Sequence, residues 1–209
     1  MTPVELARSV ADIVTRRVKG TYSIDPWGFD AELTGLLADA SRLRWSIELR
    51  GADHVPAEGP ALVVFTRRYG ISEPYVAAAA LHRTRRPLRV VGVPDMPVVG
   101  PALRRLGGVL ARPEEMTSLF RVGEVVAIPL SRTPRDRFDP GAIDPVLLEP
   151  ALRLGVPVLP VALAGRELGR RWYVEIGAPI HTTLRSGPLA DAELAEQVRA
   201  HVTTMLGHA

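Results

Sequence analysis

The sequence contains no cysteine, a single lysine and no long apolar run. Without cysteine the chain can form no disulfide, no thiolate nucleophile and no zinc site built on thiolates, and this composition fits a reducing compartment. No apolar stretch approaches the roughly 20 residues that span a bilayer. Residues 1–20 are amphipathic and charged throughout, unlike a signal peptide. We therefore predict a cytoplasmic protein, soluble or peripheral on the inner face of a membrane.

Motifs of several enzyme classes are missing as well. Neither G-x-G-x-x-G nor a G-K-[ST] loop occurs, so nothing indicates a nucleotide site. The G-x-S-x-G elbow of serine hydrolases is absent too. The five histidines lack metal-ligand spacing, and we predict neither a metal nor a cofactor. A net charge of only +3 argues against a nucleic-acid partner.

The positive charge is carried almost entirely by arginine, because Lys19 is the only lysine. The planar guanidinium group grips phosphate or carboxylate groups with two hydrogen bonds. The arginine bias therefore indicates an anionic ligand, although the base composition of the genome explains the bias equally well.

Strand and helix patterns alternate along most of the 209 residues. Apolar runs predict strands, and amphipathic spacing between them predicts helices. This alternation favours a single α/β domain with a mixed, mainly parallel sheet flanked by helices. We assign residues 1–26 to an N-terminal helix and connector, and residues 27–209 to the α/β domain. The predicted strands cover residues 45–51, 61–66, 88–93, 108–112, 124–129, 156–165 and 171–180, and the predicted helices cover residues 3–19, 30–43, 73–83, 98–107, 114–123, 144–155 and 191–206.

The first predicted helix allows two interpretations. Thr2 and Glu5 form a capping box at its start, and Arg16, Arg17 and Lys19 gather at its end, where cations suit the helix dipole. Its apolar residues follow helical spacing. Such a helix either lies on anionic lipid or packs on its own domain.

The stretch VVFTRRYGISEP, residues 63–74, places Arg67 and Arg68 directly after an apolar strand. Ser72 is positioned to cap the helix that follows. Two permanent positive charges at the mouth of a buried strand require an anionic partner, which is either a ligand or the nearby Glu73.

Five segments occur in an order and spacing that resemble a known family: ADHVPAEGPALVVFT, PVVGPALRRLGGVLAR, GEVVAIP, ALRLGVPVLPVALAG and WYVEIGAPI. They resemble the blocks of the PlsC-like glycerolipid acyltransferases, which acylate glycerol phosphate or lysophospholipids. The N-terminal segment WGFDAELTGLL is also similar, so the resemblance covers roughly residues 27–180. It implies the α/β fold of that family and a phosphate-binding arginine at the end of the second block, which here is Arg112.

The two blocks that carry the chemistry of that family are altered. Where the family has His-x4-Asp, with the histidine as general base, this chain has Arg68 and Glu73, and a shift of one residue places Arg67 there instead. Arginine stays protonated and has no lone pair with which to accept a proton. Where the family has Pro-Glu-Gly-Thr-Arg, Leu130 replaces the glutamate and Arg132 lies one place from the expected arginine.

The resemblance therefore implies a pseudoenzyme that has lost ordinary His/Asp acyl transfer. It would bind a phosphorylated or acyl lipid, or regulate a lipid enzyme. The implied ligands are a phospholipid, a lysophospholipid, acyl-CoA or acyl carrier protein, with a membrane surface as a further partner. The implied binding residues are Arg67, Arg68, Arg112, Arg132, Arg135 and Arg137. In the opposing interpretation, Arg68 pairs with Glu73, and the loop arginines pair with Asp136 and Asp139, which closes the site.

Two further hypotheses stay open. One is an active glycerolipid acyltransferase with a non-standard base, which transfers an acyl group from acyl-CoA or acyl carrier protein to glycerol-3-phosphate or a lysophospholipid. Glu73 and His82 are weak candidates for that base. The other is an interaction module that partners an active acyltransferase, which a large exposed apolar patch would favour.

Restoring the two motif residues tests the altered third block. The double variant Arg68→His, Glu73→Asp is expected to show little acyl transfer, because Leu130 still lacks the carboxylate of the family glutamate. Turnover is measured with glycerol-3-phosphate or lysophosphatidate as acceptor and acyl-CoA or acyl carrier protein as donor. Turnover at the level of an active family member would show that Leu130 does not limit the reaction.

Overall fold

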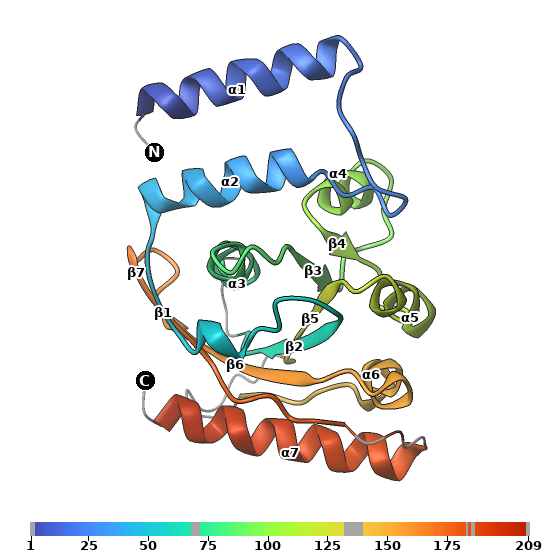
Figure 1. The fold of residues 1–209 in the computed structure, drawn as a ribbon. Helices are drawn as coiled ribbons and strands as arrows, with labels where there is room; N and C mark the ends of the chain where they lie inside the picture. Colours follow the sequence, from blue (N-terminus) through green and yellow to red (C-terminus); the bar gives the residue numbers. More distant parts are fainter. Residues whose placement is uncertain (1–2, 68–71, 132–139, 183, 185–186, 208–209) are drawn as a thin grey trace.

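In the computed structural model, which describes residues 3–67, 72–131, 140–182, 184 and 187–207, the strands form one sheet (Figure 1). Its order is β1-β7-β6-β2-β5-β3-β4, and the neighbouring strands are parallel except for β6 and β7. The mixed, mainly parallel sheet confirms the predicted fold class. The strands are β1 (Ser46–Arg50), β2 (Ala61–Phe65), β3 (Leu88–Val91), β4 (Gly108–Val109), β5 (Val125–Pro129), β6 (Val158–Gly165) and β7 (Arg171–Ile176).

Helices cover both faces of this sheet. α5, α6 and α7 pack on one face, whereas α3 packs on the other, with α2 beyond it (Figure 1). A parallel sheet covered on both faces needs strands that are apolar throughout, and all five residues of β2 are buried. The helices are α1 (Pro3–Val18), α2 (Ala31–Arg44), α3 (Glu73–His82), α4 (Val99–Arg105), α5 (Pro113–Arg121), α6 (Glu149–Leu154) and α7 (Pro188–Gly207), and two short 3-10 turns are η1 (Ala52–His54) and η2 (Pro145–Leu147).

Two elements differ from their predicted bounds for local reasons. The helix predicted at residues 144–155 is divided into η2 and α6, because Pro150 has no N–H group and suits only the first turn of a new helix. Gly155 ends α6 in the left-handed conformation, with a φ of 66°. The strand predicted at residues 108–112 is reduced to β4, because its partner β3 itself ends at Val91.

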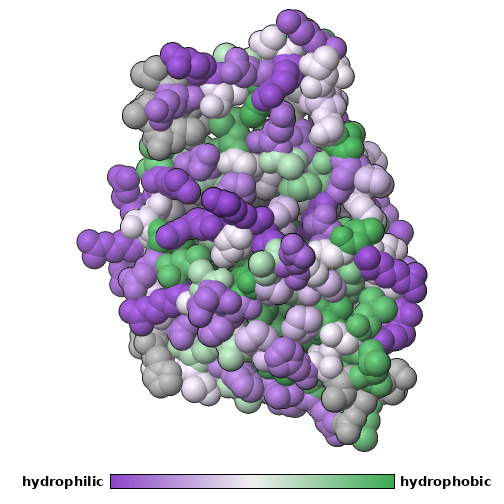
Figure 2. All heavy atoms as spheres, viewed as in Figure 1, coloured by the Kyte–Doolittle hydropathy of each residue, from purple (hydrophilic) through white to green (hydrophobic). Residues whose placement is uncertain are grey.

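α1 lies along α2 on the side away from the sheet (Figure 1). Ile13 is buried, and Arg16 pairs with Glu32 of α2 at 3.2 Å, so the helix packs on its own chain. Hydrophilic residues dominate the visible surface of these N-terminal helices (Figure 2). Three valines at helical spacing are nonetheless exposed: Val10, Val14 and Val18. Among the helices of the described ranges, none has the length and apolarity needed to cross a membrane.

Arg89 is a buried charge in the middle of β3. Its guanidinium group bonds the carboxylate of Asp25, pairs with Glu124 at 3.2 Å and lies 3.9 Å from the ring centre of Phe29. Asp25 also accepts hydrogen bonds from the N–H groups of Trp27 and Phe29. We call these four residues, Arg89, Asp25, Glu124 and Phe29, the Arg89 cluster. The cluster fastens the connector between α1 and α2 to the sheet.

Replacing Arg89 by methionine is expected to lower the free energy of unfolding by about 3 kcal/mol, because two partly buried carboxylates lose their cation. Urea denaturation measures the change. In the control variant Arg50→Gln, an exposed pair with Glu48 is removed, and the stability should stay nearly unchanged. Equal losses in the two variants would contradict the anchoring role of Arg89.

Asp191 is a second buried ionisable group, in the first turn of α7. Its Oδ1 atom has no hydrogen-bond partner within the described residues. Burial, together with the negative charge of Glu149, raises the pKa of Asp191 above its ordinary value. The folded state therefore holds the proton more tightly than the unfolded chain does. This contribution to stability is complete below the ordinary pKa of 3.8 and is lost as the pH rises through the folded-state pKa.

The variant Asp191→Asn is accordingly expected to have a higher Tm than the parent at neutral pH, because it removes a buried charge. The gain should shrink as the pH falls towards about 4, where the parent carboxyl group takes up its proton. Thermal unfolding of both proteins across this pH range measures the difference. Glu196→Gln, an exposed site on the same helix, should show no comparable pH-dependent gain. If the gain in Tm of Asp191→Asn grew as the pH fell, folding would lower the pKa of Asp191 and not raise it.

Candidate ligand-binding site

The carboxyl end of β2 places Arg67 at the candidate site. Successive side chains of a strand point to opposite faces of the sheet. Along β2, Val63 and Phe65 belong to the core under α3, whereas Leu62 and Val64 belong to the core under α5, α6 and α7. The same alternation, continued beyond the strand, directs Arg67 to the α3 side.

Thr66 holds this end of the strand in place. Its hydroxyl group donates to the carbonyl of Leu163 at 3.3 Å and accepts from the N–H group of Leu163 at 2.8 Å. On the opposite side, the N–H group of Leu130 donates to the carbonyl of Phe65 at 2.8 Å. The backbone is thus tied to both neighbouring strands immediately before Arg67, and strand pairing sets where this arginine lies.

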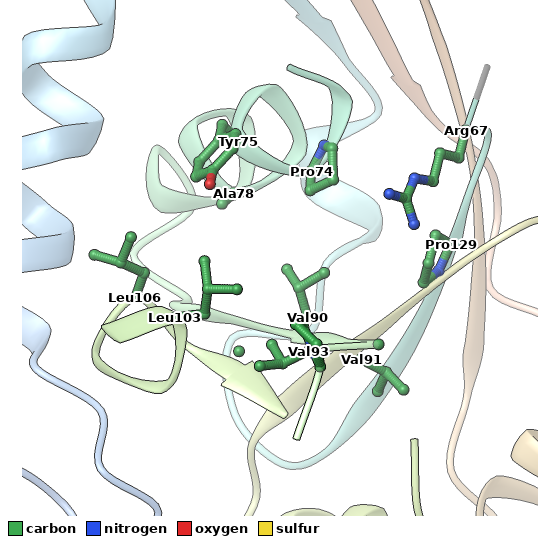
Figure 3. Close-up of a pocket in the computed structure, with 13 residues that line it drawn as sticks. Arg67, Pro74, Tyr75, Ala78, Val90, Val91, Val93, Leu103, Leu106 and Pro129 are labelled. Atoms are coloured by element: carbon green, nitrogen blue, oxygen red, sulfur yellow. The ribbon is translucent and has the colours of Figure 1, made fainter. Parts of the chain in front are cut away.

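Arg67 forms part of the wall of an apolar pocket of about 260 Å³ (Figure 3). Side chains of α3 line one side of the pocket, and those of β3 line the opposite side. Leu103 and Leu106 lie at the end near α4, while Arg67 and Pro129 lie at the other end. Pockets with mainly hydrophobic walls and few polar groups are typical of small-molecule sites. This pocket therefore suits the apolar part of a ligand.

The guanidinium group of Arg67 points towards the pocket (Figure 3). The side chain is partly buried, its Nε atom has no hydrogen-bond partner, and it forms no ion pair with any residue that the structure describes. Removing a charge from water without supplying a counterion costs free energy. The arrangement consequently favours an anionic group at this end of the pocket.

The start of α3 brings two carboxylates to the same region. Glu73 is the first residue of α3 and is only 5% exposed. Ser72 precedes it, but the prediction that Ser72 caps the helix through its own side chain is wrong. Its hydroxyl group instead donates to Oε1 of Glu167 at 2.7 Å, and its N–H group donates to Oε2 at 3.3 Å. Glu167, which follows β6, thus places its negative charge at the N-terminus of α3, where the helix dipole favours it.

The other predicted site residues lie elsewhere. Arg112 does not line the pocket, because its side chain is 61% exposed and pairs with Asp95 at 3.2 Å. Leu130 is buried in the core under α5, α6 and α7 and offers no polar group to the pocket. Four predicted residues lie outside the described residues: Arg68, Arg132, Arg135 and Arg137. Of the predicted set, the structure therefore places Arg67 at the pocket and Glu73 at the start of the adjoining helix.

Sequence reasoning missed Glu167 and the pocket itself. The sequence did contain a signal for Glu167. This residue follows β6, which is parallel to β2, and the carboxyl ends of parallel strands meet at one edge of the sheet. The pocket gave no such signal, because its valines and leucines have the same pattern as core residues. Within the described ranges, no group of histidine, aspartate and glutamate side chains could hold a metal ion.

No protein-family model matches the chain. Uncharacterized proteins of Mycobacterium bovis and Mycobacterium tuberculosis are each 29% identical to it, over 79% of this chain and 52% of their own length. An uncharacterized protein of Mycobacterium leprae is 28% identical, over 97% of this chain and 72% of its own length. The chain thus spans about half the length of the first two relatives.

A solved structure is similar over nearly the whole chain. It is the crystal structure of the 1-acyl-sn-glycerophosphate acyltransferase PlsC from Thermotoga maritima, with a TM-score of 0.64 and 16% sequence identity. The match covers 98% of this chain and 95% of that protein. The chain therefore has a PlsC-like acyltransferase fold, as the resemblance implied.

Proposed function

We propose that this protein binds an acylated, anionic ligand and does not carry out His/Asp acyl transfer. The observation that carries the proposal is Arg67, a partly buried cation without a counterion in the described structure, in the wall of an apolar pocket. The hydrocarbon chain of the ligand occupies the pocket, and its phosphate or carboxylate bonds the guanidinium group. Lysophospholipids, phospholipids, acyl-CoA and acylated acyl carrier protein have this combination of parts.

The energetics of the two halves of the ligand favour this pairing. Burial of hydrocarbon contributes about 25 cal/mol per Å² of apolar surface, which supplies affinity without direction. A charge-assisted hydrogen bond to Arg67 contributes direction and specificity, because it exists only when the head group reaches the end of the pocket. The ligand is therefore held by its chain and positioned by its charge.

The groups around the pocket support the absence of His/Asp acyl transfer. Arg67 cannot accept a proton, and Leu130 is buried on the other side of the sheet. General base catalysis is typically worth about 10²- to 10⁴-fold in rate. A chain without such a base in this position retains binding while its turnover falls.

A second candidate function is an acyltransferase with a non-standard base. The observation that favours it is the hydrogen bond of 2.7 Å between the Ser72 hydroxyl group and Glu167. This bond puts a carboxylate at the start of α3, the helix that follows the segment in which the resemblance expects the family histidine. Glu167 would then accept the proton of the acceptor hydroxyl, with Arg67 holding its phosphate.

We also place the protein at the inner face of a membrane in this proposal. Val10, Val14 and Val18 present an exposed apolar strip on α1, and Lys19 follows the helix. Although α1 packs on α2, these exposed valines would still contact a membrane, and the cation at its end would be attracted to anionic lipid. The ligand would then enter the pocket from the lipid surface.

Equilibrium binding of lysophosphatidate and of acyl-CoA tests the main proposal. Arg67→Gln is expected to weaken binding about ten- to a hundredfold, because a hydrogen bond to a charged group is worth roughly 1.5–3 kcal/mol. Ala78→Phe, which fills the pocket, should weaken binding of long acyl chains more than that of short ones. Arg50→Gln, a surface arginine on β1, is the matched control and should bind like the parent.

Turnover assays with the same ligands separate the two candidate functions. Binding without transacylation supports the main proposal. Transacylation that Glu167→Gln abolishes, with binding retained, supports the second. Unchanged affinity in both Arg67→Gln and Ala78→Phe would contradict ligand binding at this pocket.

A further inference from the structure

A second pocket, of about 360 Å³, lies where α2 and α3 end and β1 begins. Figure 1 shows β1 descending from the end of α2. Arg42 of α2, Trp45 and Ser46 at the start of β1, and His82 and Arg83 at the end of α3 line the pocket. The Arg67 pocket adjoins the opposite end of α3, where Pro74 and Tyr75 line it.

Several backbone acceptors at this place already have backbone donors. Helices end in carbonyl groups that need donors, and two such ends meet here. The carbonyl of Ser41 accepts from the N–H group of Trp45 at 2.7 Å, and the carbonyl of Ala80 accepts from the N–H group of Arg83 at 3.2 Å. The carbonyl of His82 accepts from Arg85 at 3.0 Å. The backbone therefore has little need of the side-chain donors around the pocket.

Those side-chain donors are largely unused. The imidazole of His82 forms no hydrogen bond with any residue in the described ranges. Arg83 donates one hydrogen bond, from Nη1 to the carbonyl of Ile47 at 2.9 Å. Arg42 approaches Asp39 at 3.7 Å, and its side chain is 60% exposed. Trp45 lines the pocket, and its indole N–H group is buried and has no hydrogen-bond partner among the described residues.

We propose that this pocket, the α2–α3 pocket, binds a phosphate group. Two arginines and a histidine line it, and none of the lining residues in the described part of the chain carries a carboxylate. An acceptor-only, multiply charged ligand matches such a surplus of donors. A phosphate monoester presents three terminal oxygens and so accepts from several directions at once, whereas a carboxylate presents two. The phosphate belongs either to a small soluble ester or to a lipid head group, and the chemistry of recognition is the same.

Trp45 offers a direct readout. The chain has three tryptophans, so three indole N–H signals are expected in a ¹H–¹⁵N spectrum, and Trp45→Phe identifies the one beside the pocket. Titration with inorganic phosphate at constant ionic strength, with chloride as the reference salt, should shift the Trp45 signal in a saturable way. The signals of Trp27 and Trp172 should move little, because neither residue lines the pocket.

Variants then assign the shift to the pocket. Arg42→Gln and Arg83→Gln should each weaken phosphate binding about tenfold, the loss of one charge-assisted hydrogen bond. Arg83 also holds the carbonyl of Ile47, so Arg42→Gln, whose side chain is mostly exposed, is the variant that tests binding with the fold intact. Arg50→Gln should bind phosphate like the parent, and the Trp45 signal separates this site from the Arg67 pocket, which Trp45 does not line.

Two further arms identify the source of the phosphate. Glycerol phosphate represents soluble esters, and phosphatidylcholine vesicles with and without phosphatidate represent head groups. A saturable response to either, reduced by Arg42→Gln, supports the proposal and names the source. The proposal is overturned if inorganic phosphate gives no saturable shift at Trp45, or if the shift persists unchanged in both Arg42→Gln and Arg83→Gln.

Discussion

The placement of the central strand β2 between β5 and β6 is the constraint on which the candidate site depends. Both faces of β2 are covered and its side chains alternate between two cores, so a one-residue shift of register would exchange the two sets of side chains. Thr66 extends this constraint beyond the last paired residue through its two hydrogen bonds with Leu163. The strand sets the direction of the Arg67 side chain, and this explains why a long, flexible side chain points towards the pocket.

The Arg89 cluster has the corresponding role for the N-terminal part of the chain. The connector between α1 and α2 contains glycine and proline and has no regular structure of its own, yet Asp25 and Phe29 are fixed against β3 by one guanidinium group. A buried ion pair of this kind adds little to stability over an apolar alternative, but a displaced connector would leave Arg89 buried without the carboxylate of Asp25, and a broken buried pair costs about 3–5 kcal/mol. The cluster therefore specifies where α2 begins, and with it the position of the helix pair on the sheet.

Local sequence signals identified most of the fold. The apolar runs of β2, β3 and β5 are recognisable because buried parallel strands need no alternation, and Asp30 caps α2 as expected for a helix start. The site was harder to predict because its contacts join distant segments. Glu167 bonds a serine 95 positions away in the sequence, and Arg112 finds its acid 17 positions upstream. A prediction that pairs each charged residue with partners close to it in the sequence finds neither contact.

Leu130 limits which side chains its position can accept. It is 1% exposed and packs with the core under α5, α6 and α7. A carboxylate at this position would insert a charge among aliphatic side chains unless the surrounding core were rearranged at the same time. An acid at residue 130 is thus coupled to hydrophobic packing, and a single substitution cannot introduce it without loss of stability, whereas exposed positions around the pockets carry no such constraint.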